Sequence, residues 1–263
     1  MTGHSPGTGP SWFTRAILRR PGQSLDRGIT TADLGTPDLN LALQQFDLYT
    51  RALETCGLSV EILDPLEEFP DAHFVEDSAV VAPGVAVVSR PGAGARRGEA
   101  ALMESTLAAH KPIRRIESPG TLDGGDVLMV ENHYLIGVSD RTNAAGARQL
   151  GAILEEFGHT WQTVPVAAGL HFKSSVNVVA TDTLLLTAEF AQAEALSGYK
   201  HILVPEHEAY ACNVLLVNGR LLVPSGYPET LSRLRKLGSE IIEVDTSEFR
   251  KMDGGLTCLS LRF

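Results

Sequence analysis

Cysteine is scarce in this chain, whose 263 residues include three: Cys56, Cys212 and Cys258. An odd number of thiols without metal-ligand spacing argues against a disulfide framework and against a structural zinc site. Each cysteine therefore has to be considered as a single thiol. For Cys56 and Cys212 we expect the ordinary role of a small buried hydrophobic residue.

Long apolar runs are also missing, since no stretch approaches the roughly 18 residues that a membrane helix needs. The start, Met1 to Ser11, is polar and rich in Gly and Pro, unlike a signal peptide. We predict a cytoplasmic protein without membrane contact, with a disordered tail over residues 1–11. Because no linker interrupts the rest, residues 12–263 are predicted to form a single domain.

An excess of basic residues is absent too, because the formal net charge is -10. Phosphate binding normally needs a basic face, so the composition argues against a nucleic-acid partner. A cationic small molecule suits this charge better. The hydrophobic fraction of 43% is that of an ordinary globular protein with a sizeable core.

What the chain does contain is a repeated hairpin pattern: a small polar residue, a β-branched run, a short polar turn and a second apolar run. Asn218-Gly219 is the strongest turn signal among the copies. Such periodicity predicts a repeat architecture. The four copies span residues 78–88, 126–136, 175–185 and 213–223.

Helical stretches separate the hairpins, the clearest being 142–157, where Leu150, Ile153, Leu154 and Phe157 form one apolar stripe. A second stripe contains Leu231, Leu234 and Leu237, and another helix is expected from Pro37 to Cys56. Short strands are predicted to follow the helices, at 60–63, 113–116, 160–164, 201–204 and 240–244. Pairing of two terminal strands, 12–19 and 256–263, would close a ring and remove exposed sheet edges.

Polar residues that a core would not require lie where the predicted strands begin. They occur in Phe74-Val-Glu-Asp-Ser78, in Leu122-Asp-Gly-Gly-Asp-Val127, in Gly169-Leu-His-Phe-Lys-Ser174, and at Cys258 after Gly254-Gly255. In a closed ring equivalent strand ends converge on one central channel. The repeats therefore predict a site assembled from distant positions of the chain.

These motifs, in this order, resemble those of the dimethylarginine dimethylaminohydrolases, which belong to the guanidino-modifying enzymes. Arg90-Pro-Gly-Ala-x-x-Arg-Arg97 and Ser139-x-Arg-Thr-Asn143 strengthen the resemblance, which extends from Leu25 to Cys258. It implies a five-bladed α/β propeller built from ββαβ repeats around a central channel. The implied reaction is hydrolysis of a methylated arginine to citrulline and a methylamine, without a cofactor or a metal.

The resemblance also implies roles for single residues. Cys258 would be the nucleophile, His171 the general acid and base, and Asp123 the carboxylate that holds His171 or the substrate. The guanidinium nitrogens would be held by Asp71, Glu76 and Asp77, and the α-carboxylate by Arg96 and Arg141. Leu25 would lie on the loop that covers the site, and Met252 would shape the pocket where the family often has a smaller aliphatic residue.

The chemistry supports these roles independently. A guanidinium carbon is resonance-stabilised, so attack needs a strong nucleophile, and a thiolate is the best one that a side chain offers. A free thiol, with a pKa of about 8.5, is only slightly ionised near neutrality unless a cation assists it. Protonated His171 or the substrate itself would supply that positive charge.

Other residues have ordinary structural explanations. Asp126 is equally explained as a turn former, and the spacing of His201, His207 and Glu208 fits no closed zinc site. The glycines of the segment 92–98 resemble a dinucleotide loop, but the third glycine is misplaced by one residue.

Two other functions remain open. One is an arginine deiminase or amidinotransferase of the same superfamily, which would release ammonia or transfer the amidino group. The other is a non-catalytic binding protein on the same ring, against which the cysteine, histidine and aspartate weigh. Neither the preference between mono- and dimethylarginine nor the formation of a homodimer follows from the sequence.

Overall fold

The computed structural model describes residues 13–166 and 171–263, which form five three-stranded sheets. The tail expected at residues 1–11 lies outside this part of the chain, as do Trp12 and the Gly169-Leu170 pair that precedes His171. We call each sheet with its helical connection a blade. Blades 1 to 5 contain, in spatial order, β15 (Leu261–Arg262), β1 (Arg15–Arg19) and β2 (Ser59–Leu63); β3 (Ala79–Ala82), β4 (Val85–Val88) and β5 (Ile113–Arg115); β6 (Val127–Val130), β7 (His133–Val138) and β8 (Thr160–Pro165); β9 (Val176–Ala180), β10 (Thr183–Leu186) and β11 (Lys200–Leu203); and β12 (Leu215–Val217), β13 (Arg220–Pro224) and β14 (Glu240–Val244).

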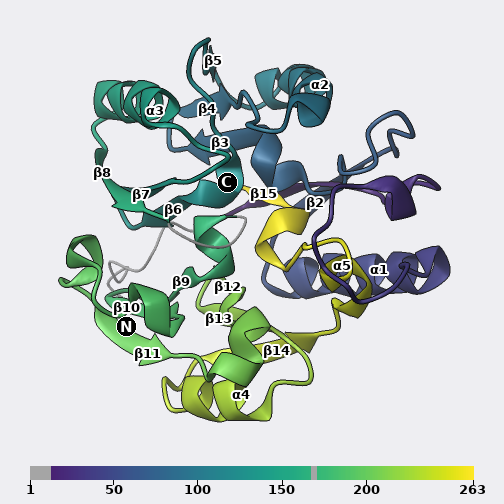
Figure 1. Cartoon of the computed structure of the whole chain (residues 1–263), viewed down its shortest axis with the longest axis vertical. Coiled ribbons are helices and arrows are strands. Elements are labelled where there is room, and N and C mark those ends of the chain that lie inside the picture. The colour runs from purple at the N-terminus through teal and green to yellow at the C-terminus, as the bar shows by residue number, and fades with distance from the viewer. Residues whose placement is uncertain (1–12, 167–170) are drawn as a thin grey trace, which may run out of the picture.

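Every blade repeats one pairing scheme, an antiparallel pair followed by a parallel outer strand. The four predicted hairpins and the five outer strands are confirmed. At the tip of β12 and β13, Asn218 and Gly219 both have positive φ, as an Asn-Gly hairpin turn requires. The sheets surround a common centre (Figure 1).

Helices cross from the middle to the outer strand in four blades. Asp38 caps the first of them by accepting a hydrogen bond from the Leu41 amide, and Asn143 caps the third through the Gly146 amide. The helix expected from Pro37 therefore begins after Asp38. The helices are α1 (Leu39–Thr55), α2 (Arg97–Ala108), α3 (Ala144–Glu156) and α4 (Pro228–Arg235), and a short α5 (Ser247–Arg250) precedes the C-terminal segment.

Blade 4 departs from the expected ββαβ repeat, because β10 and β11 are joined by two 3-10 turns, Ala188–Phe190 and Glu194–Leu196, instead of an α-helix. The buried residues of this connection, Phe190 and Leu196, are six positions apart. Such spacing does not place two side chains on one helical face. The segment therefore buries them from two separate turns.

The two ends of the described chain pair as expected and close the ring. Ala16 lies opposite Arg262 and Ile17 opposite Leu261 in an antiparallel pair. The prediction of a strand from Leu256 onward was partly wrong, because Thr257–Leu259 forms the 3-10 helix η9. This turn places Cys258 near the centre of the ring instead of within a ladder.

The core is made of clusters between neighbouring blades and their helices. Phe46, Tyr49 and Leu53 of α1, for example, are fully buried in one cluster with Leu222 of β13. Burial of one such side chain contributes roughly 1.5–3 kcal/mol to the stability of the fold.

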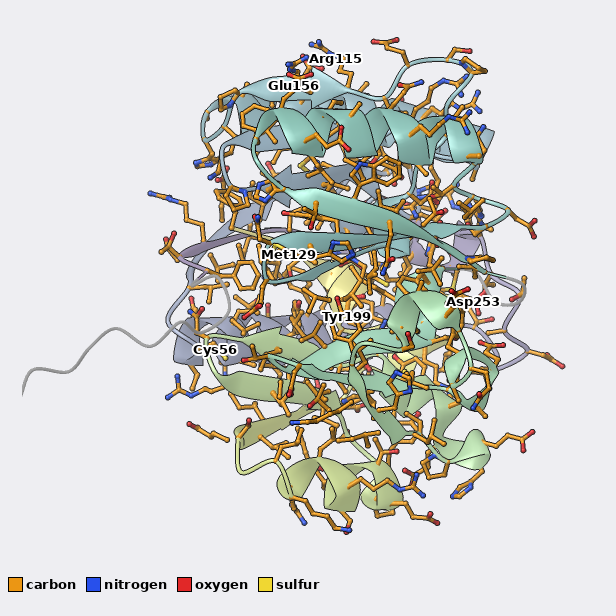
Figure 2. All side chains as sticks on the ribbon, turned by 90° about the vertical axis from the view of Figure 1, so that its left-hand side faces the viewer. Cys56, Arg115, Met129, Glu156, Tyr199 and Asp253 are labelled. Atoms are coloured by element: carbon orange, nitrogen blue, oxygen red, sulfur yellow. The ribbon has the colours of Figure 1, made fainter. Side chains whose placement is uncertain are left out.

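Seen edge-on, the ring of blades has Asp253 near one face and Cys56 near the opposite face (Figure 2). Within the described residues, no helix is both long and apolar enough to cross a membrane.

Candidate active site

Four short 3-10 helices lead into the centre of the ring and bring distant motifs together. They are η2 (Val75–Ser78), η4 (Gly124–Asp126), η5 (Phe172–Ser174) and η9, and η2 contacts both η4 and η9, while η4 contacts η5. The glycines of η4 make this contact possible, because a Cβ on Gly124 would lie 1.9 Å from the Glu76 carbonyl oxygen. The polar residues at the strand entrances therefore meet as the repeat predicted.

His171 lies between two carboxylates. Its Nε2 atom is 3.0 Å from Oδ2 of Asp123 and 3.7 Å from Oδ1 of Asp77. The backbone amide of Gly92 donates to the other Asp123 oxygen at 2.9 Å, and that of Gly125 donates to Asp77 at 2.9 Å. Both carboxylates are thus held in place by backbone groups and direct their charge at the imidazole.

These charges favour the imidazolium form of His171. Burial alone lowers its pKa, but Asp77, the Asp123 hydrogen bond and Asp126 outweigh burial and raise the pKa to about 9. For Asp77 the balance is the reverse: burial raises its pKa, while His171 and Arg96 lower it to about 2. His171 is therefore charged at neutral pH and can donate a proton to a leaving group.

Cys258 lines the same cavity as His171. Its backbone amide donates to the Gly255 carbonyl at 3.2 Å, and its sulfur lies 4.0 Å from Oγ1 of Thr257. Burial, followed by the negative charges of Glu76 and Asp77, raises the pKa of this thiol to about 12. Without a bound cation the sulfur is consequently protonated at neutral pH.

The cavity has a volume of about 30 Å³, which holds little more than a water molecule. Seven of the ten residues predicted for the site line it. Asp123, with no exposed surface, lies directly behind His171. The complete wall consists of Ile29, Asp71, Phe74, Asp77, Arg96, Arg141, His171, Met252, Asp253, Gly254 and Cys258.

Two residues that were predicted to contact the substrate do not line this cavity. Leu25 is 2% exposed and packs in the hydrophobic cluster between blades 1 and 5, and Ile29 of the same segment forms part of the cavity wall. Glu76 faces a second cavity, where Lys173 and Arg262 donate to its Oε1 atom at 2.6 and 3.1 Å. The reason is the tight turn of η2, which directs consecutive side chains to different sides.

The two arginines predicted to bind a carboxylate have different surroundings. Arg96 is almost completely buried and donates to Asp77, to Glu99 and to the carbonyls of Asp71 and Phe74. Arg141 is less constrained, and its Nη1 lies 3.9 Å from Asp123. Direct carboxylate binding therefore stays a prediction for both, with Arg141 the better placed.

Sequence reasoning missed Ile29 and Asp253 in the cavity wall. The Ile29 amide donates to both oxygens of Asp71, and Asp253 accepts from the amide and, at 3.0 Å, from the hydroxyl of Thr31. Asp253 adjoins Met252 and the Gly254-Gly255 pair, a signal that could have identified it. Ile29 carried no such signal, because an apolar residue in a loop has many explanations.

A metal could use the carboxylates around His171. Asp77, Asp123 and His171 each offer one ligand atom, and the three atoms lie within 4.8 Å of one another. The residues His201, His207 and Glu208 have ordinary partners. His201 bonds the Leu196 carbonyl, His207 lies 3.3 Å from Glu229, and Glu208 accepts from the Thr230 amide at the start of α4. Asp126, which was equally explained as a turn former, accepts from the Phe172 amide at 2.8 Å and so supports the histidine turn.

Comparisons with known proteins find dimethylarginine dimethylaminohydrolases and arginine deiminases. A family model described as arginine deiminase matches residues 59–199. The N(G),N(G)-dimethylarginine dimethylaminohydrolase of Pseudomonas aeruginosa is 44% identical over 95% of this chain and all of its own length, and that of Streptomyces coelicolor is 40% identical over 94% of this chain and 96% of its own. An arginine deiminase of Mycobacterium avium is 33% identical over 52% of this chain and 36% of its own.

Solved structures give the same result. The Pseudomonas aeruginosa enzyme, as a cysteine-to-serine variant complexed with citrulline, superposes with a TM-score of 0.94 at 44% identity, covering 96% of this chain and all of that one. The N-terminal domain of a cyanobacterial arginine dihydrolase, 18% identical, superposes with a TM-score of 0.85 over 94% of this chain and 97% of that one. This second likeness concerns the fold alone.

Proposed function

This chain belongs to the dimethylarginine dimethylaminohydrolase family, and we propose that it hydrolyses N-omega-methylated arginines to citrulline and a methylamine. The observation that carries the proposal is that Cys258 and a charged His171 line one cavity, with Asp123 fixing the histidine. The carboxylates of Asp71 and Asp77 in the same wall favour a cationic guanidinium. The reaction needs no cofactor.

In the proposed first step, the sulfur of Cys258 attacks the guanidinium carbon and the thiol proton passes to solvent. Burial and nearby negative charges keep the thiol protonated, and the approaching cation offsets their effect, so ionisation and substrate binding are coupled. His171 then donates its proton to the departing dimethylamine. The product of this step is a covalent thiouronium on Cys258 and a neutral imidazole.

In the second step, neutral His171 removes a proton from water, and the resulting hydroxide attacks the thiouronium carbon. Citrulline leaves when the carbon–sulfur bond breaks, and a proton returns to the sulfur. A single histidine serves both transfers, because it is the acid in the first step and the base in the second.

Admission of the substrate requires the cavity to widen. Ile29 is 39% exposed, and its segment is tied down by the carboxylates of Asp71 and Asp253. We propose that this segment, rather than the interior, moves aside, because its exposed hydrogen bonds to Asp253 are readily exchanged with water. All three thiols are free, as suits the cytoplasmic location that we propose.

Product analysis tests this function. Dimethylarginine, monomethylarginine and arginine should each be incubated with the enzyme, and citrulline, dimethylamine, methylamine and ammonia quantified. We expect citrulline with an equal amount of dimethylamine or methylamine. Faster release of ammonia from arginine would instead identify a deiminase, and transfer of the amidino group to an added amine would identify an amidinotransferase. No turnover of any substrate would support a binding protein.

A further inference from the structure

Asn213 connects the turn that carries the nucleophile with the turn that carries the histidine. It is the small polar residue at the start of the fourth hairpin repeat and is 6% exposed. It takes no part in the bond-making and bond-breaking steps of the proposed reaction. We propose that Asn213 is a positioning residue that acts on Cys258 through Thr257; the inference rests on the proposed function of Cys258.

The contacts of the Asn213 amide fix its orientation. Its Oδ1 atom accepts from the Thr257 backbone amide at 3.0 Å, and its Nδ2 group donates to Oγ1 of Thr257 at 3.2 Å and to the Lys173 carbonyl at 3.3 Å. A backbone N–H can only donate, so the atom that meets it must be the amide oxygen. The nitrogen is thereby directed at the Thr257 hydroxyl.

This orientation determines what the Thr257 hydroxyl can do. Because its oxygen accepts from Asn213, its own hydrogen is available for the Cys258 sulfur at 4.0 Å. A hydrogen bond to a thiolate favours the charged form over the thiol. Asn213 therefore both holds η9 in place and directs a donor at the sulfur.

The same amide sets the distance between the two catalytic turns. Lys173, whose carbonyl it bonds, lies in η5, which starts directly after His171. On the other side Gly255 packs against Asn213, since a Cβ at this glycine would lie 2.5 Å from Cγ of Asn213. Misplacement of a reacting group by about 1 Å can reduce a rate by roughly 100-fold.

Asn177 provides a matched control. It is 2% exposed, and its Nδ2 group donates to the same Lys173 carbonyl at 2.6 Å and to the Cys212 carbonyl at 2.9 Å. Among its described hydrogen bonds, none reaches η9. Asn177→Ala therefore removes a comparable buried amide from the same neighbourhood without touching the turn of the nucleophile.

The experiment compares Asn213→Ala, Asn177→Ala, Thr257→Val and Thr257→Ser with the wild type. For each, kcat, KM, Tm and the pH dependence of Cys258 alkylation by iodoacetamide are measured, with the modified cysteine located by mass spectrometry. We expect Asn213→Ala and Thr257→Val to lower kcat about 10- to 100-fold with little change in KM. Both variants should move the midpoint of the pH profile of Cys258 alkylation to higher pH. Thr257→Ser should recover most of the kcat that is lost in Thr257→Val.

Asn177→Ala should lower Tm about as much as Asn213→Ala while kcat stays within about threefold of the wild type. Equal losses of kcat in both asparagine variants, or an unchanged alkylation profile in Asn213→Ala, would overturn the proposal. If Asn213→Ala does not fold, the comparison of Thr257→Val with Thr257→Ser tests the proposal through the pH profile of Cys258 alkylation. Failure of the wild type to turn over methylarginines would refute the function separately, because alkylation does not require turnover.

Discussion

The Nε2 atom of His171 lies 3.0 Å from Oδ2 of Asp123, a pair that joins blade 4 to blade 3. Asp123 has no exposed surface, and its second oxygen accepts from the Gly92 amide. The carboxylate of Asp123 therefore orients the imidazole of His171 and stabilises its charged form.

Asp123→Asn tests this relationship. The substitution keeps the shape but removes a charge that raises the pKa of His171, so the pKa should fall. We expect kcat to decrease by about 10²–10³-fold and its alkaline limb to move to lower pH. The pH–rate profile is the measurement, with Asp182→Asn at an exposed ion pair as control. An alkaline limb in the same place would contradict the assignment.

The free energy of unfolding should depend on pH through His171. Its pKa is raised from about 6.5 to about 9, so its stabilising contribution is complete below about pH 6.5 and is lost as pH rises through 9. Denaturant unfolding of the wild type and His171→Gln at pH 6 and 9.5 should give a difference that shrinks by on the order of 1–3 kcal/mol. A difference that grows with pH would contradict the predicted direction of the pH dependence.

Asp77 contributes to the pH dependence of stability only under acidic conditions. Its pKa is lowered to about 2, so its stabilising contribution is lost as pH falls through about 2.

Arg141→Ala should raise KM about 10- to 100-fold with a smaller effect on kcat, because a charge-assisted bond to the α-carboxylate contributes roughly 1.5–3 kcal/mol. Steady-state kinetics with dimethylarginine provides the measurement. Arg148→Ala, at an exposed position on α3, is the matched control. Unchanged kinetics in Arg141→Ala would show that another residue holds the carboxylate.

Gly125→Ala should impair catalysis by steric crowding alone. A Cβ at this position would lie 2.7 Å from Nδ1 of His171 and 2.8 Å from Oδ1 of Asp77. We expect kcat to fall at least about tenfold as the imidazole is displaced. At Gly198 a Cβ has nothing within 4 Å, so Gly198→Ala should behave as the wild type. Equal activity of both variants would mean that the histidine tolerates displacement.

Cys258→Ser should abolish turnover, with a loss of at least about 10³-fold, because a hydroxyl is a far weaker nucleophile than a thiolate. Tm and circular dichroism should stay close to those of the wild type. A covalent adduct trapped with a slow substrate should map to Cys258 by mass spectrometry and disappear in the variant. A fully active serine variant would rule out the covalent scheme.

The blades were predictable because their signals are local. Alternating apolar residues and turn dipeptides such as Asn218-Gly219 specify hairpins within a few positions. The absence of an α-helix in blade 4 was not predictable, because the burial of Phe190 and Leu196 depends on the neighbouring blades. The 3-10 turn at Thr257–Leu259 was likewise decided by its tertiary partners, Asn213 among them.

The sequence by itself determined which chemical groups are available and that the repeats would bring them to one centre. Only the tertiary structure decided that Asp77 faces the cavity while its neighbour Glu76 turns toward Lys173 and Arg262. It also decided the charge states of His171 and Cys258. The physical reason is that side-chain direction in a tight turn, burial and the field of nearby charges arise from groups on separate blades, and no local pattern of residues contains them.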